Sequence, residues 1–115
     1  MSSNIRSRGR VGVAAWTIAV VGAGGMGGLH ARNAAASARF ELAAIADHSR
    51  DAAGRLAGRL GARAAPYEEI LADPEVKAVI VASSTSSHLE NVIAAVRAGK
   101  AVFCEKPVSL SADAL

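Results

Sequence analysis

A glycine-rich segment at residues 22–27 constrains the fold of this chain more than any other feature of its sequence. The segment reads Gly-Ala-Gly-Gly-Met-Gly and follows the apolar run Thr-Ile-Ala-Val-Val at residues 17–21. The spacing G-x-G-x-x-G between a strand and a helix is typical of loops that hold the pyrophosphate of a dinucleotide. Its first glycine permits a tight turn, its second lets the backbone approach the phosphates, and its third lets helix and strand pack closely.

The rest of the sequence alternates predicted strands with predicted helices. Apolar runs predict strands at residues 17–21, 40–46, 62–65, 78–82 and 101–104. Helical spacing, caps and stop signals predict helices at residues 26–38, 50–60, 66–71 and 87–98. Strands that alternate with helices form right-handed crossovers and a parallel sheet. The pattern therefore predicts an α/β fold, a doubly wound Rossmann sheet of which about five strands are present.

Two of the predicted helices carry side chains that we expect to face the sheet. In the helix at 26–38 these are Met26, Leu29, Asn33 and Ala34. Ser87 to Glu90 has the pattern of a capping box, which places a helix start at Ser87. In the helix that it opens, the expected inward residues are Leu89, Val92, Ile93 and Val96.

The composition limits the partners and the compartment. The chain has 115 residues and a net charge of +3, and Arg6, Arg8 and Arg10 account for the excess. The basic balance thus reflects an N-terminal tail and not a nucleic-acid footprint. We expect residues 1–15 to form a disordered or loose basic extension and residues 16–115 to form a truncated dinucleotide-binding domain. No apolar stretch is long enough to span a bilayer, which predicts a cytoplasmic protein without membrane contact.

The single cysteine, Cys104, excludes a disulfide within the chain and a metal site built from several cysteines. Because Cys104 lies in an apolar run, we expect it to be an inert core residue and not a nucleophile.

Asp47 stands at the end of the second predicted strand, 25 residues after Gly22. A carboxylate at this position accepts hydrogen bonds from the adenosine ribose and repels a 2′-phosphate, which favours NAD over NADP. Arg50 keeps NADP open, because an arginine nearby can pair with that phosphate. The alternative for Asp47 is a turn or capping acid.

Glu105, Lys106 and Pro107 end the fifth predicted strand, at the same edge of the sheet as the glycine loop. A lysine beside a reacting hydroxyl can polarise it or stabilise an oxyanion formed by hydride loss. Glu105 can orient that lysine and help to position the nicotinamide ribose. The alternative is an exposed ion pair in a loop.

Taken with the glycine loop and Asp47, the segments at 81–88 and 99–107 resemble the Gfo/Idh/MocA oxidoreductase family. The resemblance covers residues 17–115, and Glu-Lys-Pro at 105–107 is its most distinctive part. Within the family, the string Phe-Cys-Glu-Lys-Pro is similar to that of inositol 2-dehydrogenases. The resemblance implies hydride transfer between a nicotinamide and a hydroxyl carbon of a sugar or polyol, with myo-inositol as one candidate.

The resemblance also implies a role for each matching residue. Lys106 would contact the substrate hydroxyl. The cofactor would be bound by Gly22, Gly24, Gly25, Met26, Gly27, Asp47, Ser83, Thr85, His88 and Glu105. Of these, Ser83, Thr85 and His88 would line its nicotinamide half. A second domain, absent from this chain, would supply the substrate pocket, a catalytic aspartate and histidine, and the interface of a homo-oligomer. The chain alone is therefore expected to be inactive.

Three alternatives remain open at this point. The chain could be a non-catalytic nucleotide-binding module or a partner subunit that completes another chain. A Rossmann methyltransferase would also use Asp47, but Glu105 and Lys106 have no evident task in methyl transfer. His88 could act as a general base, although its place in the predicted capping box favours a helix-start role combined with cofactor contact.

Overall fold

A computed structural model describes residues 16–83 and 85–104, without the side chain of Thr85. Its sheet has five strands in the order β3-β2-β1-β4-β5. The strands are β1 (Trp16–Val21), β2 (Phe40–Ala46), β3 (Arg63–Ala64), β4 (Ala78–Val81) and β5 (Ala101–Cys104). Every adjacent pair is parallel. This confirms the predicted Rossmann-type α/β fold.

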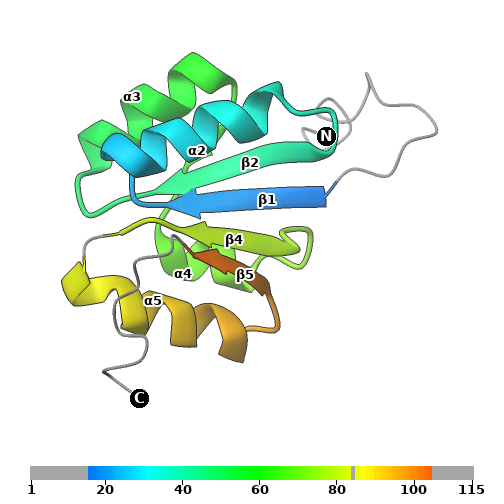
Figure 1. Cartoon of the computed structure of the whole chain (residues 1–115), viewed down its shortest axis with the longest axis vertical. Coiled ribbons are helices and arrows are strands. Elements are labelled where there is room, and N and C mark those ends of the chain that lie inside the picture. The colour runs from blue at the N-terminus through cyan, green and yellow to red at the C-terminus, as the bar shows by residue number, and fades with distance from the viewer. Residues whose placement is uncertain (1–15, 84, 105–115) are drawn as a thin grey trace.

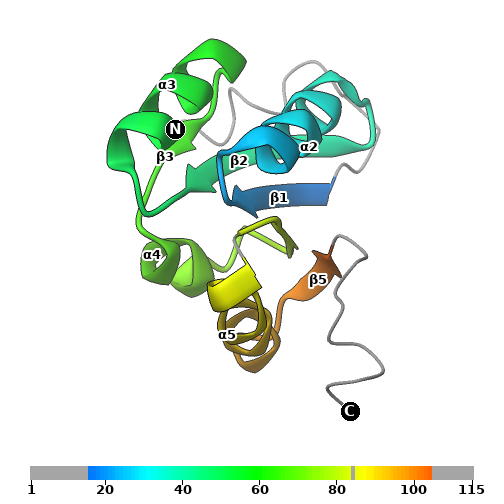
Figure 2. The ribbon, with the colours of Figure 1, turned by 60° about the vertical axis from the view of Figure 1, so that its left-hand side comes forward.

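Helices of the described residues cover both faces of the sheet (Figures 1 and 2). They are α2 (Gly25–Ala36), α3 (Arg50–Leu60), α4 (Tyr67–Ala72) and α5 (Thr85–Arg97). Helices α2 and α3 lie on one face, and α4 and α5 lie on the other. Because β1 is central, the connection from β2 and β3 to β4 crosses to the opposite side of β1, and the helix layer changes with it.

Alternation along β1 fills both layers of the core. Ile18 and Val20 pack toward α2 and α3, whereas Ala19 and Val21 pack toward α4 and α5. All four side chains are buried, as expected for a strand covered on both faces. The pairing of β1 with β2 shifts register between Ile18 and Ala19, where β2 contributes one extra residue, Ala43.

The face that α2 presents to the sheet differs from the expected one. Its buried residues are Gly27, Gly28, Ala31 and Ala34, while Met26, Leu29 and Asn33 are exposed. Only Ala34 of the four expected residues is buried. The helix approaches the sheet so closely that only small side chains fit between them. The stripe of glycine and alanine therefore faces the sheet, and the larger apolar residues face outward.

Helix α5 also differs from the expectation. It begins at Thr85, two positions before Ser87, so the predicted capping box is wrong. His88 and Ala95 are buried and Val92 is partly buried against the core. Leu89, Ile93 and Val96, which were expected inside, are exposed. The observed inner face is thus rotated by about one residue, or about 100°, from the expected one, which followed the largest apolar side chains.

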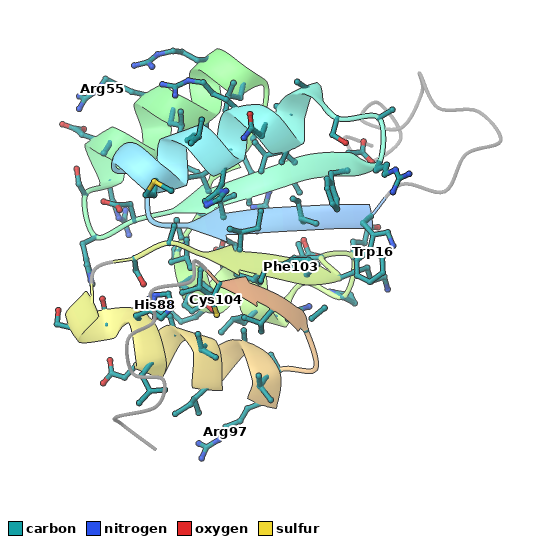
Figure 3. All side chains as sticks on the ribbon, in the orientation of Figure 1. Trp16, Arg55, His88, Arg97, Phe103 and Cys104 are labelled. Carbon is teal, nitrogen blue, oxygen red and sulfur yellow. The ribbon has the colours of Figure 1, made fainter. Side chains whose placement is uncertain are left out.

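Two further apolar positions lie at the surface. Trp16, which starts β1, and Phe103 of β5 are both exposed (Figure 3). Cys104 is exposed as well, so the expected core position for this thiol is wrong. It ends β5, where the strand leaves the covered part of the sheet. No helix within the described residues is long and apolar enough to cross a membrane.

Candidate functional site

Two glycines of the segment at residues 22–27, which joins β1 to α2 and forms its first turn, are required by the local geometry. Gly22 has a φ of +109°, and a Cβ there would lie 2.5 Å from the carbonyl oxygen of Ala82. A Cβ on Gly27 would lie 1.7 Å from the carbonyl oxygen of Gly22. The first glycine therefore allows the turn beside β4, and the third lets α2 start directly against the loop, as the motif predicts.

The middle of the loop is open. A Cβ on Gly24 or Gly25 would meet no atom within 4 Å, and both residues are exposed. No side chain caps the N-terminus of α2, and its first turn holds no acid. Backbone amides at an uncapped helix start, together with the positive end of the helix dipole, form a site for an anion such as a pyrophosphate.

Asp47 follows β2 and joins it to the glycine loop. Its Oδ1 accepts a hydrogen bond of 2.9 Å from the backbone N–H of Ala23, and its Oδ2 accepts one of 2.9 Å from the backbone N–H of Ser49. The cap of α3 is Ser49, whose hydroxyl oxygen accepts from the N–H of Ala52 at 3.1 Å. Asp47 thus has a turn contact, as the alternative interpretation proposed, and also a contact with the loop. Each carboxylate oxygen keeps a further acceptor site.

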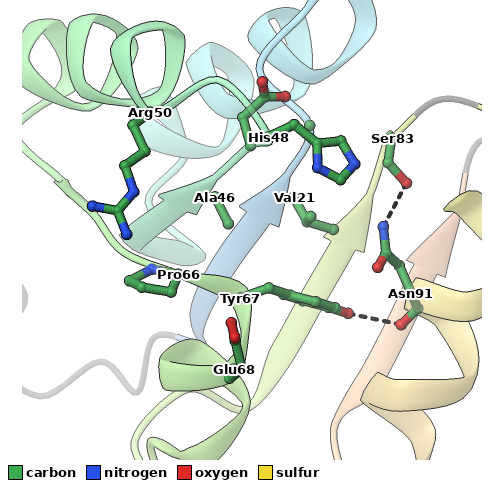
Figure 4. Close-up of a pocket in the computed structure, with 11 residues that line it drawn as sticks. Val21, Ala46, His48, Arg50, Pro66, Tyr67, Glu68, Ser83 and Asn91 are labelled. Atoms are coloured by element: carbon green, nitrogen blue, oxygen red, sulfur yellow. Dashed lines mark hydrogen bonds between the residues drawn. The ribbon is translucent and has the colours of Figure 1, made fainter.

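A hollow of about 420 Å³ opens at the carboxyl ends of β1, β2 and β4 (Figure 4). Ligands of open α/β sheets bind at this edge, where the strand order reverses. Asp47 and Ser83, which the sequence analysis selected, line it together with Gly22. Its other lining residues are Val21, Ala46, His48, Arg50, Pro66, Tyr67, Glu68 and Asn91.

Tyr67 of α4 and Asn91 of α5 also line the hollow, although neither was predicted from the sequence. The hydroxyl of Tyr67 donates a hydrogen bond of 2.8 Å to the backbone carbonyl of Asn91. The side-chain amide of Asn91 donates one of 2.9 Å to the hydroxyl of Ser83. Burial raises the pKa of Tyr67 to about 12. Asn91 was missed because the expected inner face of α5 followed its large apolar residues, and Asn91 is not one of them.

The other selected residues lie apart from this hollow or outside the described residues. His88 is 9% exposed on α5, and its Nε2 has no hydrogen-bond partner. Met26 is exposed at the start of α2. Thr85 is the first residue of α5, and its side chain is not described. Glu105 and Lys106 lie outside the described residues.

A second, smaller hollow of about 280 Å³ lies between α2 and α3. Gly24 and Gly25 are among its lining residues, and so are three arginines, Arg32, Arg55 and Arg59. Within residues 16–83 and 85–104, no group of three or more histidine, cysteine and acidic side chains could hold a metal ion.

Comparison with known proteins places this geometry in a family. The profile of the family described as "Oxidoreductase family, NAD-binding Rossmann fold" matches residues 16–115. Inositol 2-dehydrogenase of Rhizobium meliloti is 36% identical over 94 residues, which are 82% of this chain and 28% of that protein. Myo-inositol 2-dehydrogenase of Thermotoga maritima is 43% identical over 96 residues, 82% of this chain and 29% of that protein.

Solved structures give the same result. GenD2 of gentamicin A biosynthesis, in complex with NAD, superposes with a TM-score of 0.80 at 37% identity, over 84% of this chain and 28% of that one. Myo-inositol dehydrogenase of Lactobacillus casei, in complex with NAD(H) and myo-inositol, superposes with a TM-score of 0.77 at 27% identity. The match covers 83% of this chain and 29% of that one. The chain thus spans less than a third of the length of these relatives. The predicted resemblance is confirmed: the chain belongs to the Gfo/Idh/MocA oxidoreductase family, whose NAD-binding Rossmann fold it contains.

Proposed function

We propose that this chain is the dinucleotide-binding domain of an NAD-dependent oxidoreductase that acts on a hydroxyl group of a sugar or polyol. The observation that carries the proposal is the position of Asp47. Its carboxylate lines the hollow at the carboxyl edge of the sheet and is hydrogen-bonded to the glycine loop. A dinucleotide needs both features at once, because its ribose and its pyrophosphate are covalently joined.

The residues present fit NAD. The exposed backbone of Gly24 and Gly25, at an uncapped helix start, would hold the pyrophosphate, and Asp47 would accept hydrogen bonds from the adenosine ribose. Arg50 lines the same hollow and favours NADP. We prefer NAD, because two backbone N–H groups fix the carboxylate of Asp47, whereas Arg50 is an exposed side chain at the start of α3.

The chemical step rests on residues outside the described part of the chain. When bound, NAD supplies the hydride acceptor. Lys106 would contact the substrate hydroxyl and stabilise negative charge on its oxygen, and Glu105 would contact the cofactor. Ser83, Thr85 and His88 would line the cofactor. These roles follow from the family resemblance and remain proposals, as does the domain span of residues 16–115.

The substrate class is proposed from the relatives. Those of Rhizobium meliloti and Thermotoga maritima are named inositol 2-dehydrogenases, which supports a polyol and makes myo-inositol the first candidate. The same names support an oxidoreductase and give no support to the non-catalytic module considered above. A homo-oligomer and a cytoplasmic location remain predictions.

Titration of the chain with NADH and with NADPH tests this function. We expect saturable binding of both, with NADH tighter. Asp47→Asn removes the negative charge with little change of shape, and it should raise the ratio of NADPH to NADH affinity by about tenfold, the effect of about one charged hydrogen bond. The ratio compares two ligands of one protein, so partial unfolding of the variant does not change it.

Asp51→Asn is the matched control, because Asp51 is an exposed acid in the first turn of α3 and does not line the hollow. It should leave the ratio unchanged. Absence of saturable binding of either nucleotide would contradict the proposed function. Tighter binding of NADPH by the unsubstituted chain would assign the specificity to Arg50 instead of Asp47.

A further inference from the structure

Two hydrogen bonds link three polar residues along the hollow at the carboxyl edge (Figure 4), one to the backbone carbonyl of Asn91 and one from its side-chain amide. The path starts at Tyr67, the first residue of α4, and passes through Asn91 on α5. It ends at Ser83, just after β4, and all three residues line the hollow. The path therefore connects two helices to the loop that follows β4.

The direction of the last bond decides what Ser83 can do. A serine hydroxyl has one proton to donate and two acceptor sites. Nδ2 of Asn91 donates to Oγ of Ser83 at 2.9 Å and so occupies one acceptor site. The NH₂ group of Asn91 that donates this bond cannot also accept the serine proton. The serine proton therefore goes to another acceptor, and Ser83 lines the hollow, where an oxygen of a ligand can accept it.

The beginning of the path is fixed in place. Tyr67 packs its ring against the core cluster on the α4 and α5 side of the sheet. Its hydroxyl donates to the carbonyl of Asn91 at 2.8 Å. Because burial raises the pKa of Tyr67 to about 12, the phenol stays protonated and remains a donor at neutral pH. The backbone of α5 at Asn91 is thereby held in one position relative to α4.

We propose that Tyr67 and Asn91 are positioning residues that keep Ser83 as a hydrogen-bond donor to an oxygen of the ribose–phosphate backbone of a bound dinucleotide. The inference rests on the proposed function. Ser83 lines the same hollow as Asp47, and the ligand class follows from that arrangement. A carboxylate and a serine donor suit a ligand that carries both hydroxyl donors and phosphate or ribose acceptors, which a dinucleotide does.

A double-mutant cycle between Ser83 and Asn91, read as NADH affinity of the chain, tests the path. Asn91→Asp keeps the shape of the side chain but makes it an acceptor, which takes the proton of Ser83 and ends its donation. We expect Asn91→Asp to weaken NADH binding by about tenfold or more while Ser83 is present. In the Ser83→Ala background, only the repulsion between the new charge and the phosphates remains, and the loss should be about threefold or less.

Tyr67→Phe gives a second reading that removes a single hydroxyl. It should weaken NADH binding by about two- to fourfold with Ser83 present and leave the Ser83→Ala variant unchanged. Glu90→Gln is the control, because Glu90 is an exposed neighbour on α5 that does not line this hollow. Thermal unfolding of each variant separates affinity from stability, since a merely structural role would lower the midpoint in both backgrounds alike.

The possible results separate this inference from the function on which it depends. If the unsubstituted chain binds NADH but Asn91→Asp and Tyr67→Phe act equally with and without Ser83, the positioning role is overturned and the proposed function stands. Unchanged affinity in Ser83→Ala would overturn the donor role of Ser83, and with it the positioning role of Tyr67 and Asn91, while the proposed function stands. If the unsubstituted chain does not bind NADH, both proposals fail together.

Discussion

Oδ1 of Asp47 accepts a hydrogen bond of 2.9 Å from the backbone N–H of Ala23, across 24 positions of the sequence. The bond connects the end of β2 to the glycine loop that follows β1. The group proposed to bind the adenosine ribose and the backbone proposed to bind the pyrophosphate are therefore parts of one fixed unit. Both are in place before a ligand arrives, which reduces the entropy that binding must overcome.

A methyl group at Gly27 should disrupt the fold. A Cβ there would lie 1.7 Å from the carbonyl oxygen of Gly22, and backbone atoms on both sides must shift to make room. We expect Gly27→Ala to lower the free energy of unfolding by more than about 2 kcal/mol, at the upper end of overpacking effects. Chemical denaturation followed by circular dichroism measures the loss.

Gly58 provides the matched control for this substitution. It lies in α3, and a Cβ there would meet no atom within 4 Å. Gly58→Ala should therefore stabilise the chain by about 0.5–1 kcal/mol, because alanine favours a helix over glycine. Equal effects of the two substitutions would contradict the close contact between Gly27 and the loop.

Tyr67 should ionise far above neutral pH. It is the only tyrosine of the chain, so absorbance near 295 nm reports its titration alone. Because burial disfavours tyrosinate, we expect a midpoint near pH 12 in the folded chain, against the ordinary tyrosine pKa of 10.0. A spectrophotometric titration measures the midpoint, and a value near 10 would show that the ring is solvated.

The same shift predicts how stability depends on pH. In the unfolded chain the phenol loses its proton near its ordinary pKa, while the folded chain keeps it until about 12. The stabilisation is complete below pH 10 and is lost as the pH rises from 10 to 12. Across this range, the free energy of unfolding should fall more steeply for the unsubstituted chain than for Tyr67→Phe.

Two isoleucines distinguish the observed orientation of the helices from the expected one. Ile70 of α4 is 0% exposed, whereas Ile93 of α5 is 43% exposed. Ile70→Ala should cost about 2–5 kcal/mol of unfolding free energy, and Ile93→Ala should cost less than about 1 kcal/mol. The same denaturation measurement serves both variants. A large loss at Ile93 would restore the inner face that the capping-box pattern had predicted.

The elements that the sequence predicted well are those in which one physical constraint dominates. The glycine loop is determined by sterics at Gly22 and Gly27, and the buried strands are determined by continuous apolar runs. Helix α3 carries its own cap at Ser49 and its own stop at Gly61, and its bounds followed from them. The order of elements and the edge at which the site lies could therefore be derived without a structure.

The orientation of α2 and α5 could not be derived in the same way. In α2, the close contact at Gly27 turns the face with the smallest residues toward the sheet. A prediction that places the largest apolar side chains inside would choose that face last. In α5, His88, Val92 and Ala95 face the core in place of the larger apolar residues, and Asn91 lines the hollow. The hydrogen bonds of Tyr67 and Asn91 join α4 and α5, which come together only in the folded chain. No local sequence pattern predicts these bonds.

The position at which NAD binds is the most direct test of the account. Amide resonances of the isotope-labelled chain, followed by NMR during titration with NAD⁺, report that position residue by residue. We predict saturable shifts at Gly24, Gly25, Asp47 and Ser83, and none at Trp16, where β1 begins at the opposite edge of the sheet. Saturable shifts confined to that opposite edge, or to Arg32, Arg55 and Arg59 in the hollow between α2 and α3, would contradict the assigned site.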